Sequence, residues 1–285
     1  MSRIAANPIP YWSKAGKTRE VFEEAFRDFQ AIGFTATKAD VPDGMTVGEY
    51  REWIAGYGLS PALSLFNSPF DETVDMAVEL EKAKRFGAQQ AALGLDRTMV
   101  SSMARPERIA RPAVGTGFDA GRLDRAIENV GAVCRVLRTE GIWPLHHSHV
   151  GGVFETGDEI TKLLDDLGPD LIGAGPDTGH LAWAGVDPAA FIRRYADRLG
   201  GIHIKDVFPL AGLPDLSYPE LAATKRLWAE PGLGTVDFTA VLDAIPAGYD
   251  GDFMIEVDEP SVESKAESHR ISYEWARSFL AGRVT

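Results

Sequence analysis

Short apolar runs alternate along the chain with longer amphipathic stretches that repeat apolar residues at helical spacing. Phe22, Ala25, Phe26 and Phe29 are one such set, and they predict a helix over residues 19–32. The alternation indicates βα units and a mostly parallel sheet. We predict eight strands, at residues 4–6, 34–37, 61–66, 90–95, 142–147, 171–175, 201–204 and 252–256. The predicted helices cover residues 19–32, 47–57, 73–85, 123–140, 158–167, 188–199, 238–245 and 264–280.

Eight strands in 285 residues leave about 36 residues for each unit, which favours an α/β fold of the (β/α)8 TIM-barrel type over a doubly wound open sheet. We expect one domain over residues 1–285, because no Gly/Ser-rich linker or shift in composition divides the chain. Two stretches depart from the regular pattern. An Arg-rich segment near residues 96–121 is predicted to be a lid-like insertion, and a long loop is predicted near residues 208–234.

The charge of the chain narrows the choice of partners. With 29 Lys and Arg against 42 Asp and Glu the formal net charge is −13, which argues against nucleic acid and acidic membranes as ligands. No run of about 18 apolar residues and no apolar signal segment is present, so we expect a cytoplasmic protein without a membrane partner. The one cysteine, Cys134, cannot form an internal disulfide and falls on the apolar stripe of a predicted helix.

Unusual polar residues gather where the last four predicted strands end, which in a β/α barrel is the mouth that carries the chemistry. They are His146, His147, Ser148 and His149, then Asp177 and His180, then His203, Lys205 and Asp206, and finally Glu256 and Asp258. Because side chains alternate along a strand, we expect His147 and His149 to point the same way, away from His146 and Ser148.

Asp177, His203 and Glu256 come from three successive strand ends, and either His147 or His149 comes from the strand before them. Two imidazoles and two carboxylates form a mixed nitrogen and oxygen set that suits a divalent metal. Mn²⁺, Co²⁺, Zn²⁺ and Fe²⁺ all suit these types of ligand, so the set alone does not choose among them. Mn²⁺ is the metal that we expect.

Several segments resemble the xylose isomerase-like TIM-barrel superfamily of sugar isomerases, epimerases and lyases, and its inosose (2-keto-myo-inositol) dehydratase branch most closely. They are residues 147–156, 177–188, 202–207 and 232–238, together with 7–12 at the end of the first strand. The resemblance implies a metal set of Glu, Asp, His and Glu. Asp177, His203 and Glu256 match the last three places, and a histidine stands in the first. Counting six residues from Gly141 favours His147, whereas counting six back from Glu155 favours His149, so both stay open.

The resemblance further implies a metal-dependent lyase that dehydrates a keto-sugar or keto-cyclitol similar to 2-keto-myo-inositol. The related epimerases use two metal-bound Glu residues on opposite faces of the substrate, so a histidine in one place favours one-way elimination. A keto-sugar 3-epimerase, an aldose-ketose isomerase and a lyase that removes a glycoside from a 3-keto-sugar are the alternatives. The resemblance also allows a homo-oligomer, although helix packing explains the apolar segments 227–228 and 273–275 equally well.

Elimination from such a ketone needs a base with a pKa near 7, which histidine supplies. The base is therefore expected to be whichever of His147 and His149 does not bind the metal, with Glu256 as the alternative. The other expected roles fall to four residues. Lys205 would stand beside the developing oxyanion with Asp206 as its ion-pair partner, His180 would donate to a substrate hydroxyl, and Trp12 would cover the ring of the substrate.

Overall fold

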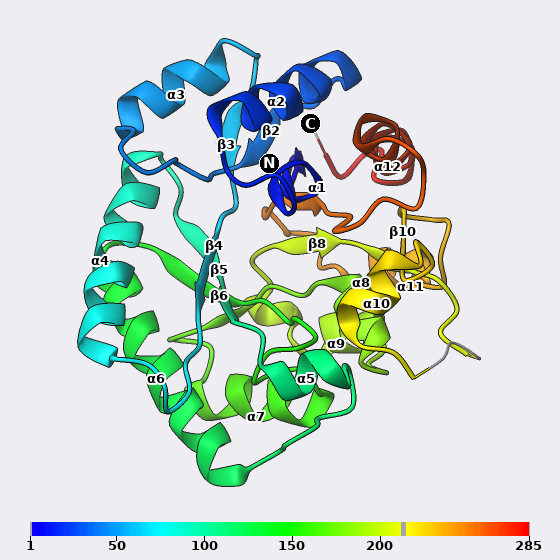
Figure 1. Cartoon of the computed structure of the whole chain (residues 1–285). Coiled ribbons are helices and arrows are strands. Elements are labelled where there is room, and N and C mark those ends of the chain that lie inside the picture. Colours follow the sequence, from blue (N-terminus) through cyan, green and yellow to red (C-terminus); the bar gives the residue numbers. More distant parts are fainter. Residues whose placement is uncertain (1, 212–214, 285) are drawn as a thin grey trace.

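Nine parallel strands close into a barrel in the computed structural model, which describes residues 2–211 and 215–284 (Figure 1). They are β1 (Ile4–Ala6), β2 (Ala36–Lys38), β3 (Ser60–Ala62), β4 (Leu65–Ser68), β5 (Arg97–Ser102), β6 (Trp143–His146), β7 (Gly173–Ala174), β8 (Ile202–Ile204) and β11 (Phe253–Ile255). The sheet orders are β3-β2-β1-β11-β8 and β4-β5-β6-β7. β3 and β4 together occupy one position, and single bridges at Ala174–Leu199 and Asp177–His203 join β7 to the β8 side. The predicted eightfold barrel is confirmed.

Helices surround the strands (Figure 1). The main ones are α2 (Arg19–Ile32), α3 (Val47–Ala55), α4 (Met76–Ala92), α6 (Ala120–Thr139), α7 (Gly157–Leu167), α9 (Pro188–Arg194), α11 (Phe238–Ala244) and α12 (Lys265–Phe279). Shorter elements follow the carboxyl ends of strands: α1 (Ile9–Trp12), α5 (Pro106–Ala110), α8 (Thr178–Trp183), α10 (Tyr218–Ala223) and the antiparallel pair β9 (Asp206–Val207) and β10 (Trp228–Ala229). These shorter elements build the mouth of the barrel.

The inside of the barrel is filled by a layer of apolar side chains: Ala5, Ala36, Ala62, Leu63, Met99, Leu145 and Met254. Since strand side chains alternate, the residues two positions further along face the same interior, one layer closer to the mouth. Asn7, Lys38, His147 and Glu256 stand in that relation to Ala5, Ala36, Leu145 and Met254. The apolar layer therefore forms the floor of a polar layer.

The fourth predicted strand was wrong. Residues 90–95 lie in the last turn of α4 and the turn after it, and the strand is β5, at Arg97–Ser102. The segment near 96–121 is thus no lid-like insertion over its whole length, because its first part is a barrel strand. Thr98, Ser101 and Ser102 are buried in β5, so this strand lacks the apolar pattern that we used to find the others. The expected loop near 208–234 likewise contains α10 and β10, and its residues 212–214 lie outside the described part.

Two further observations bear on the composition. Within residues 2–211 and 215–284 no helix is both long enough and apolar enough to cross a membrane.

Cys134 is a free, buried thiol in α6, and burial raises its pKa. It packs in an apolar cluster with Val130, Val133 and Leu137, which agrees with its predicted place on the apolar stripe.

Close packing at the start of β7 requires glycine at position 173. A Cβ there would lie 2.5 Å from Trp143 Cζ2 and 2.8 Å from the backbone oxygen of Arg198. We expect Gly173→Ala to lower the free energy of unfolding by about 1–3 kcal/mol, measured by denaturant titration. Gly48→Ala is the control, because a Cβ in α3 meets nothing within 4 Å and should leave stability unchanged or slightly higher. Equal stabilities for the two variants would contradict this packing.

Candidate metal centre

Four strand ends bring His147, Asp177, His203 and Glu256 to one buried point. One ligand atom from each lies within 4.8 Å of the corresponding atom of every other. The four residues are at most 4% exposed. They come from β6, β7, β8 and β11, which are neighbours in the barrel, so the strand order itself gathers them. The structure therefore brings four of the five candidate ligands together, and His147 rather than His149 lies in this group.

Several buried polar atoms at this point are poorly partnered. His147 Nδ1 has no hydrogen bond to any described residue, and Asp177 Oδ2 has none besides an ion-pair contact of 3.3 Å with Lys205 Nζ. His203 Nδ1 lies 2.9 Å from Glu256 Oε2 and 4.0 Å from Asp177 Oδ2. Buried polar atoms are nearly always satisfied, so a group of unsatisfied ones needs an explanation. A divalent cation accepts lone pairs from imidazole and carboxylate at once, and these residues fit one.

Asp177 is fixed by the helix that it begins. It is the N-cap of α8, and its Oδ1 accepts a hydrogen bond of 2.8 Å from the backbone N–H of His180. That bond holds one carboxylate oxygen, a role that Asp fills well at this position. The other oxygen, Oδ2, is left for the centre. Burial raises the pKa of Asp177 to about 6, although the nearby ammonium of Lys205 acts in the opposite direction.

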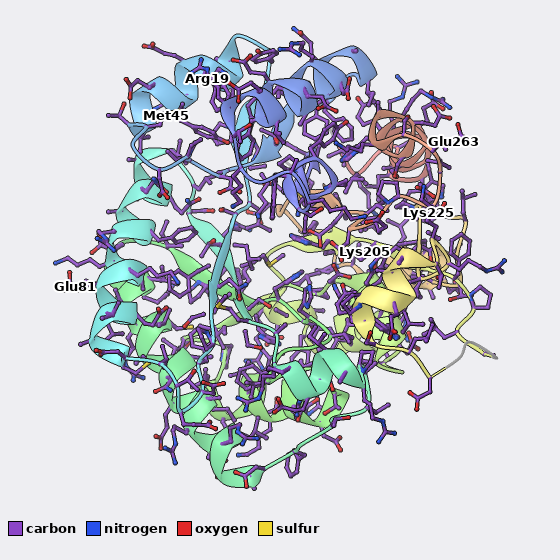
Figure 2. All side chains as sticks on the ribbon, in the orientation of Figure 1. Arg19, Met45, Glu81, Lys205, Lys225 and Glu263 are labelled. Carbon is purple, nitrogen blue, oxygen red and sulfur yellow. The ribbon has the colours of Figure 1, made fainter. Side chains whose placement is uncertain are left out.

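Lys205 lies fully buried beside the four residues, and Figure 2 shows it inside the ring of helices. Its Nζ is 2.6 Å from Glu256 Oε1, 2.9 Å from Asp258 Oδ2 and 3.3 Å from Asp177 Oδ2. Burial acts to lower the pKa of Lys205, but these three carboxylates together raise it well above its ordinary value. Gly179 makes room for the lysine, since a Cβ there would lie 2.6 Å from Lys205 Cγ.

A second cluster, formed by His149, His180 and Asp258, adjoins the first. Its cation is already present, because Lys205 Nζ lies 3.2 Å from His180 Nε2 as well as next to Asp258. The other nitrogen of His180, Nδ1, accepts a hydrogen bond of 3.2 Å from the backbone N–H of Val150. Because Nδ1 accepts, Nε2 carries the proton of the neutral ring, so Lys205 does not donate to it; the nearest carboxylate oxygen to Nε2 is Asp258 Oδ2 at 3.7 Å. This cluster is a network around an ammonium group.

His149 is held in one tautomer by its neighbour. Its Nδ1 lies 2.7 Å from the carbonyl oxygen of Val150. A carbonyl only accepts, so Nδ1 carries the proton and the lone pair of the neutral ring is on Nε2. The ring packs on His180 with 3.9 Å between centroids and is half-buried. Burial lowers the pKa of His149. The neutral ring therefore keeps its lone pair on Nε2, and its centroid lies 6.2 Å from that of His147 in the four-residue cluster.

Known proteins of the same fold place this arrangement in a family. The sequence model of the family described as xylose isomerase-like TIM barrel matches residues 24–279. The chain belongs to this family. An inosose dehydratase of Geobacillus kaustophilus (strain HTA426) is 22% identical over 247 residues, which cover 83% of this chain and 80% of the relative.

Two solved structures share the xylose isomerase-like barrel. A probable 3-DHS dehydratase, AsbF, from Bacillus anthracis has a TM-score of 0.72 at 10% identity, covering 96% of this chain and 98% of its own. The IolI protein, whose structure has a zinc atom, has a TM-score of 0.71 at 13% identity and covers 98% of both chains. At these identities the two structures establish the shared fold.

One role that we predicted within this xylose isomerase-like barrel does not fit the geometry. Asp206 makes no ion pair with Lys205. Its carboxylate accepts hydrogen bonds from the backbone N–H groups of Val207, Gly232, Gly234 and Val236, so it ties β9 to the segment before α11. Lys205 and Asp206 are adjacent, and their side chains point to opposite faces of the strand.

The remaining predicted residues lie as follows. His146 and Ser148 are buried, and His146 packs edge-on against Phe154 on the helix side of β6, as the alternation predicted. Trp12 is half-buried at the end of α1, and its Nε1 has no acceptor among the described residues. Lys17 Nζ lies 4.5 Å and Lys38 Nζ 5.7 Å from the centroid of its ring.

Sequence reasoning gave no role to several residues that surround the centre. Asn7 Nδ2 donates to Glu256 Oε2, Tyr218 donates to Asp258 over 3.2 Å, and Lys205 Nζ lies 4.7 Å from the ring centroid of Trp228. Asp258 was detectable, because it follows Glu256 by two residues and shares its face. Tyr218 and Trp228 come from the segment that we expected to be a loop. No periodic pattern in that segment predicts which side chains point toward the centre.

The two strand-five histidines should differ in their effect on metal affinity. We expect His147→Ala to weaken binding of Mn²⁺ or Zn²⁺ by at least about 100-fold, since it removes a ligand, and even residues that only orient ligands contribute 10–100-fold. His149→Ala should change the affinity by less than about tenfold. Competition with a fluorescent chelator measures both. Stronger loss in His149→Ala than in His147→Ala would reverse the assignment.

Proposed function

We propose that the protein is a divalent-metal-dependent dehydratase that removes water from a keto-sugar or keto-cyclitol. The observation that carries the proposal is the buried set of two histidines and two carboxylates beside His149, whose Nε2 is basic. The inosose dehydratase relative, which aligns with most of the chain, supports the same reaction class. The metal centre and the base together supply what elimination next to a ketone requires.

His147, Asp177, His203 and Glu256 would hold the metal. Mn²⁺ is our first choice, and Co²⁺, Zn²⁺ and Fe²⁺ suit the same mixture of imidazole and carboxylate. When bound, a divalent cation at this point acts as a Lewis acid on the carbonyl oxygen of the substrate, which acidifies the neighbouring C–H bond.

His149 is the base in this proposal. Its Nε2 takes the proton from the carbon next to the carbonyl, and the electron pair of the broken C–H bond forms the new double bond. The imidazolium of His149 then gives this proton to the departing β-hydroxyl, so that water leaves and the ring is neutral again. Glu256 is less suited to this role, because Lys205 and Asn7 already bond to its two oxygens.

Lys205 and His180 act on the other residues in this proposal. The ammonium of Lys205 bonds Glu256 and Asp258 and contacts Asp177, so it keeps these carboxylates ionised and oriented. His180 packs against His149 and fixes the plane of its ring. Both are positioning residues. An epimerase would instead need a base on each face of the substrate, and His147 stands where the second carboxylate of such a pair would be.

The test is NMR spectroscopy of 2-keto-myo-inositol in D₂O with the Mn²⁺-loaded protein. We expect metal-dependent formation of the dehydrated diketone, and in His149→Ala a rate at least about 100-fold lower. The metal content of that variant should match the wild type, which separates loss of the base from loss of the centre. Deuterium entering the substrate without loss of water would overturn the proposal in favour of an epimerase or isomerase. Absence of both reactions would overturn 2-keto-myo-inositol as the substrate.

A further inference from the structure

The mouth of the barrel has two halves of different chemistry. β6, β7, β8 and β11 supply the proposed metal ligands. In the other half, β2 ends at Lys38, which is 7% exposed. Lys38 follows Ala36 of the apolar floor by two residues, so it faces the barrel interior in the same layer as Glu256. A lysine is thus buried opposite the ligand set.

Lys38 shares the carboxylate that acts on it most strongly, that of Asp40, with Lys17. Among residues 2–211 and 215–284, no ion pair or hydrogen bond to its Nζ is formed. The nearest acidic residue along the chain is Asp40, and its carboxylate is bound by Lys17 at 2.6 Å. One carboxylate thus lies between two ammonium groups. Burial lowers the pKa of Lys38, although Asp40 and, at longer range, Glu256 and Asp258 partly oppose this effect.

The charges in the metal half are balanced without Lys38. Lys205 has Asp258 as a counter-charge, and the carboxylates of Asp177 and Glu256 balance a divalent cation. The ammonium of Lys38 is then the charge left over. A largely buried ammonium that only shares a carboxylate is costly, and such costs are tolerated where a ligand supplies the partner. Trp12 Nε1, on the ring beside Lys38, is a second buried donor without an acceptor.

We propose that Lys38 binds a carboxylate of the substrate, with Trp12 Nε1 as a second donor, so that the substrate is an acidic keto-sugar or keto-cyclitol. The inference rests on the proposed function for the statement that the substrate is a sugar or cyclitol ketone. The statement that it also carries a carboxylate rests on Lys38 and Trp12. One ammonium balances one negative charge, whereas a phosphate monoester carries nearly two at neutral pH. Lys38 is thus a specificity-determining residue.

Binding of two polyols that are not turned over tests the inference. Quinate is a carboxylated ring and myo-inositol is a neutral one, and isothermal calorimetry measures both on the Zn²⁺-loaded protein. We expect the wild type to bind quinate at least about tenfold more tightly, since one charge-assisted bond is worth that factor or more. Lys38→Met should abolish this preference, and Lys38→Arg should retain most of it. Lys14→Met, which removes an exposed lysine, is the control and should behave as the wild type.

Other outcomes overturn the inference. If Lys38→Met keeps the preference for quinate, the carboxylate binds the metal instead. If this variant loses both ligands and melts at a lower temperature, Lys38 has a structural role. We expect its melting temperature to stay level or rise, because an unpaired buried charge is removed. Since no turnover is needed, a preference that depends on Lys38 in a protein without dehydratase activity would leave the anion site standing and overturn the proposed reaction.

Discussion

The need to compensate buried charge governs the mouth of this barrel. Three carboxylates, those of Asp177, Glu256 and Asp258, lie within a few ångströms of one ammonium group, Lys205. Taking so much charge out of water is costly unless each charge has a partner. One lysine cannot balance three carboxylates, and the unpartnered Nδ1 of His147 lies in the same group as two of them. A divalent cation held there would balance the remaining two.

The rest of the fold serves this arrangement. The layer of apolar side chains inside the barrel separates the polar layer from solvent at the other end of the barrel. The parallel strands bring the four proposed ligands to the same end of the barrel. Asp177 is oriented by beginning α8, and Gly179 in the same helix lets the stem of Lys205 pass. Trp228 and Tyr218 cover the lysine from the segment between β9 and α11. These features come from separate parts of the chain, and together they position the four proposed ligands and the proposed base.

The sequence predicted those parts of the structure that depend on strand alternation and on strand order. The barrel, the gathering of Asp177, His203 and Glu256, and the opposite directions of His146 and His147 all follow from these two regularities. β5 was missed because its buried face carries Thr and Ser in place of aliphatic residues. The partner of Asp206 was missed because it is the backbone of a distant segment, which leaves no pattern in the sequence. Strand alternation does not predict that His147 lies in the four-residue group and His149 in the other one, because both were expected to face the same way.

The most direct test of this account is anomalous diffraction from crystals grown with Mn²⁺, recorded on both sides of the manganese absorption edge. We predict one strong peak bounded by His147, Asp177, His203 and Glu256, with Lys205 still bonded to Glu256 and Asp258. A peak between His149, His180 and Asp258, or no peak near these strand ends, would contradict the account.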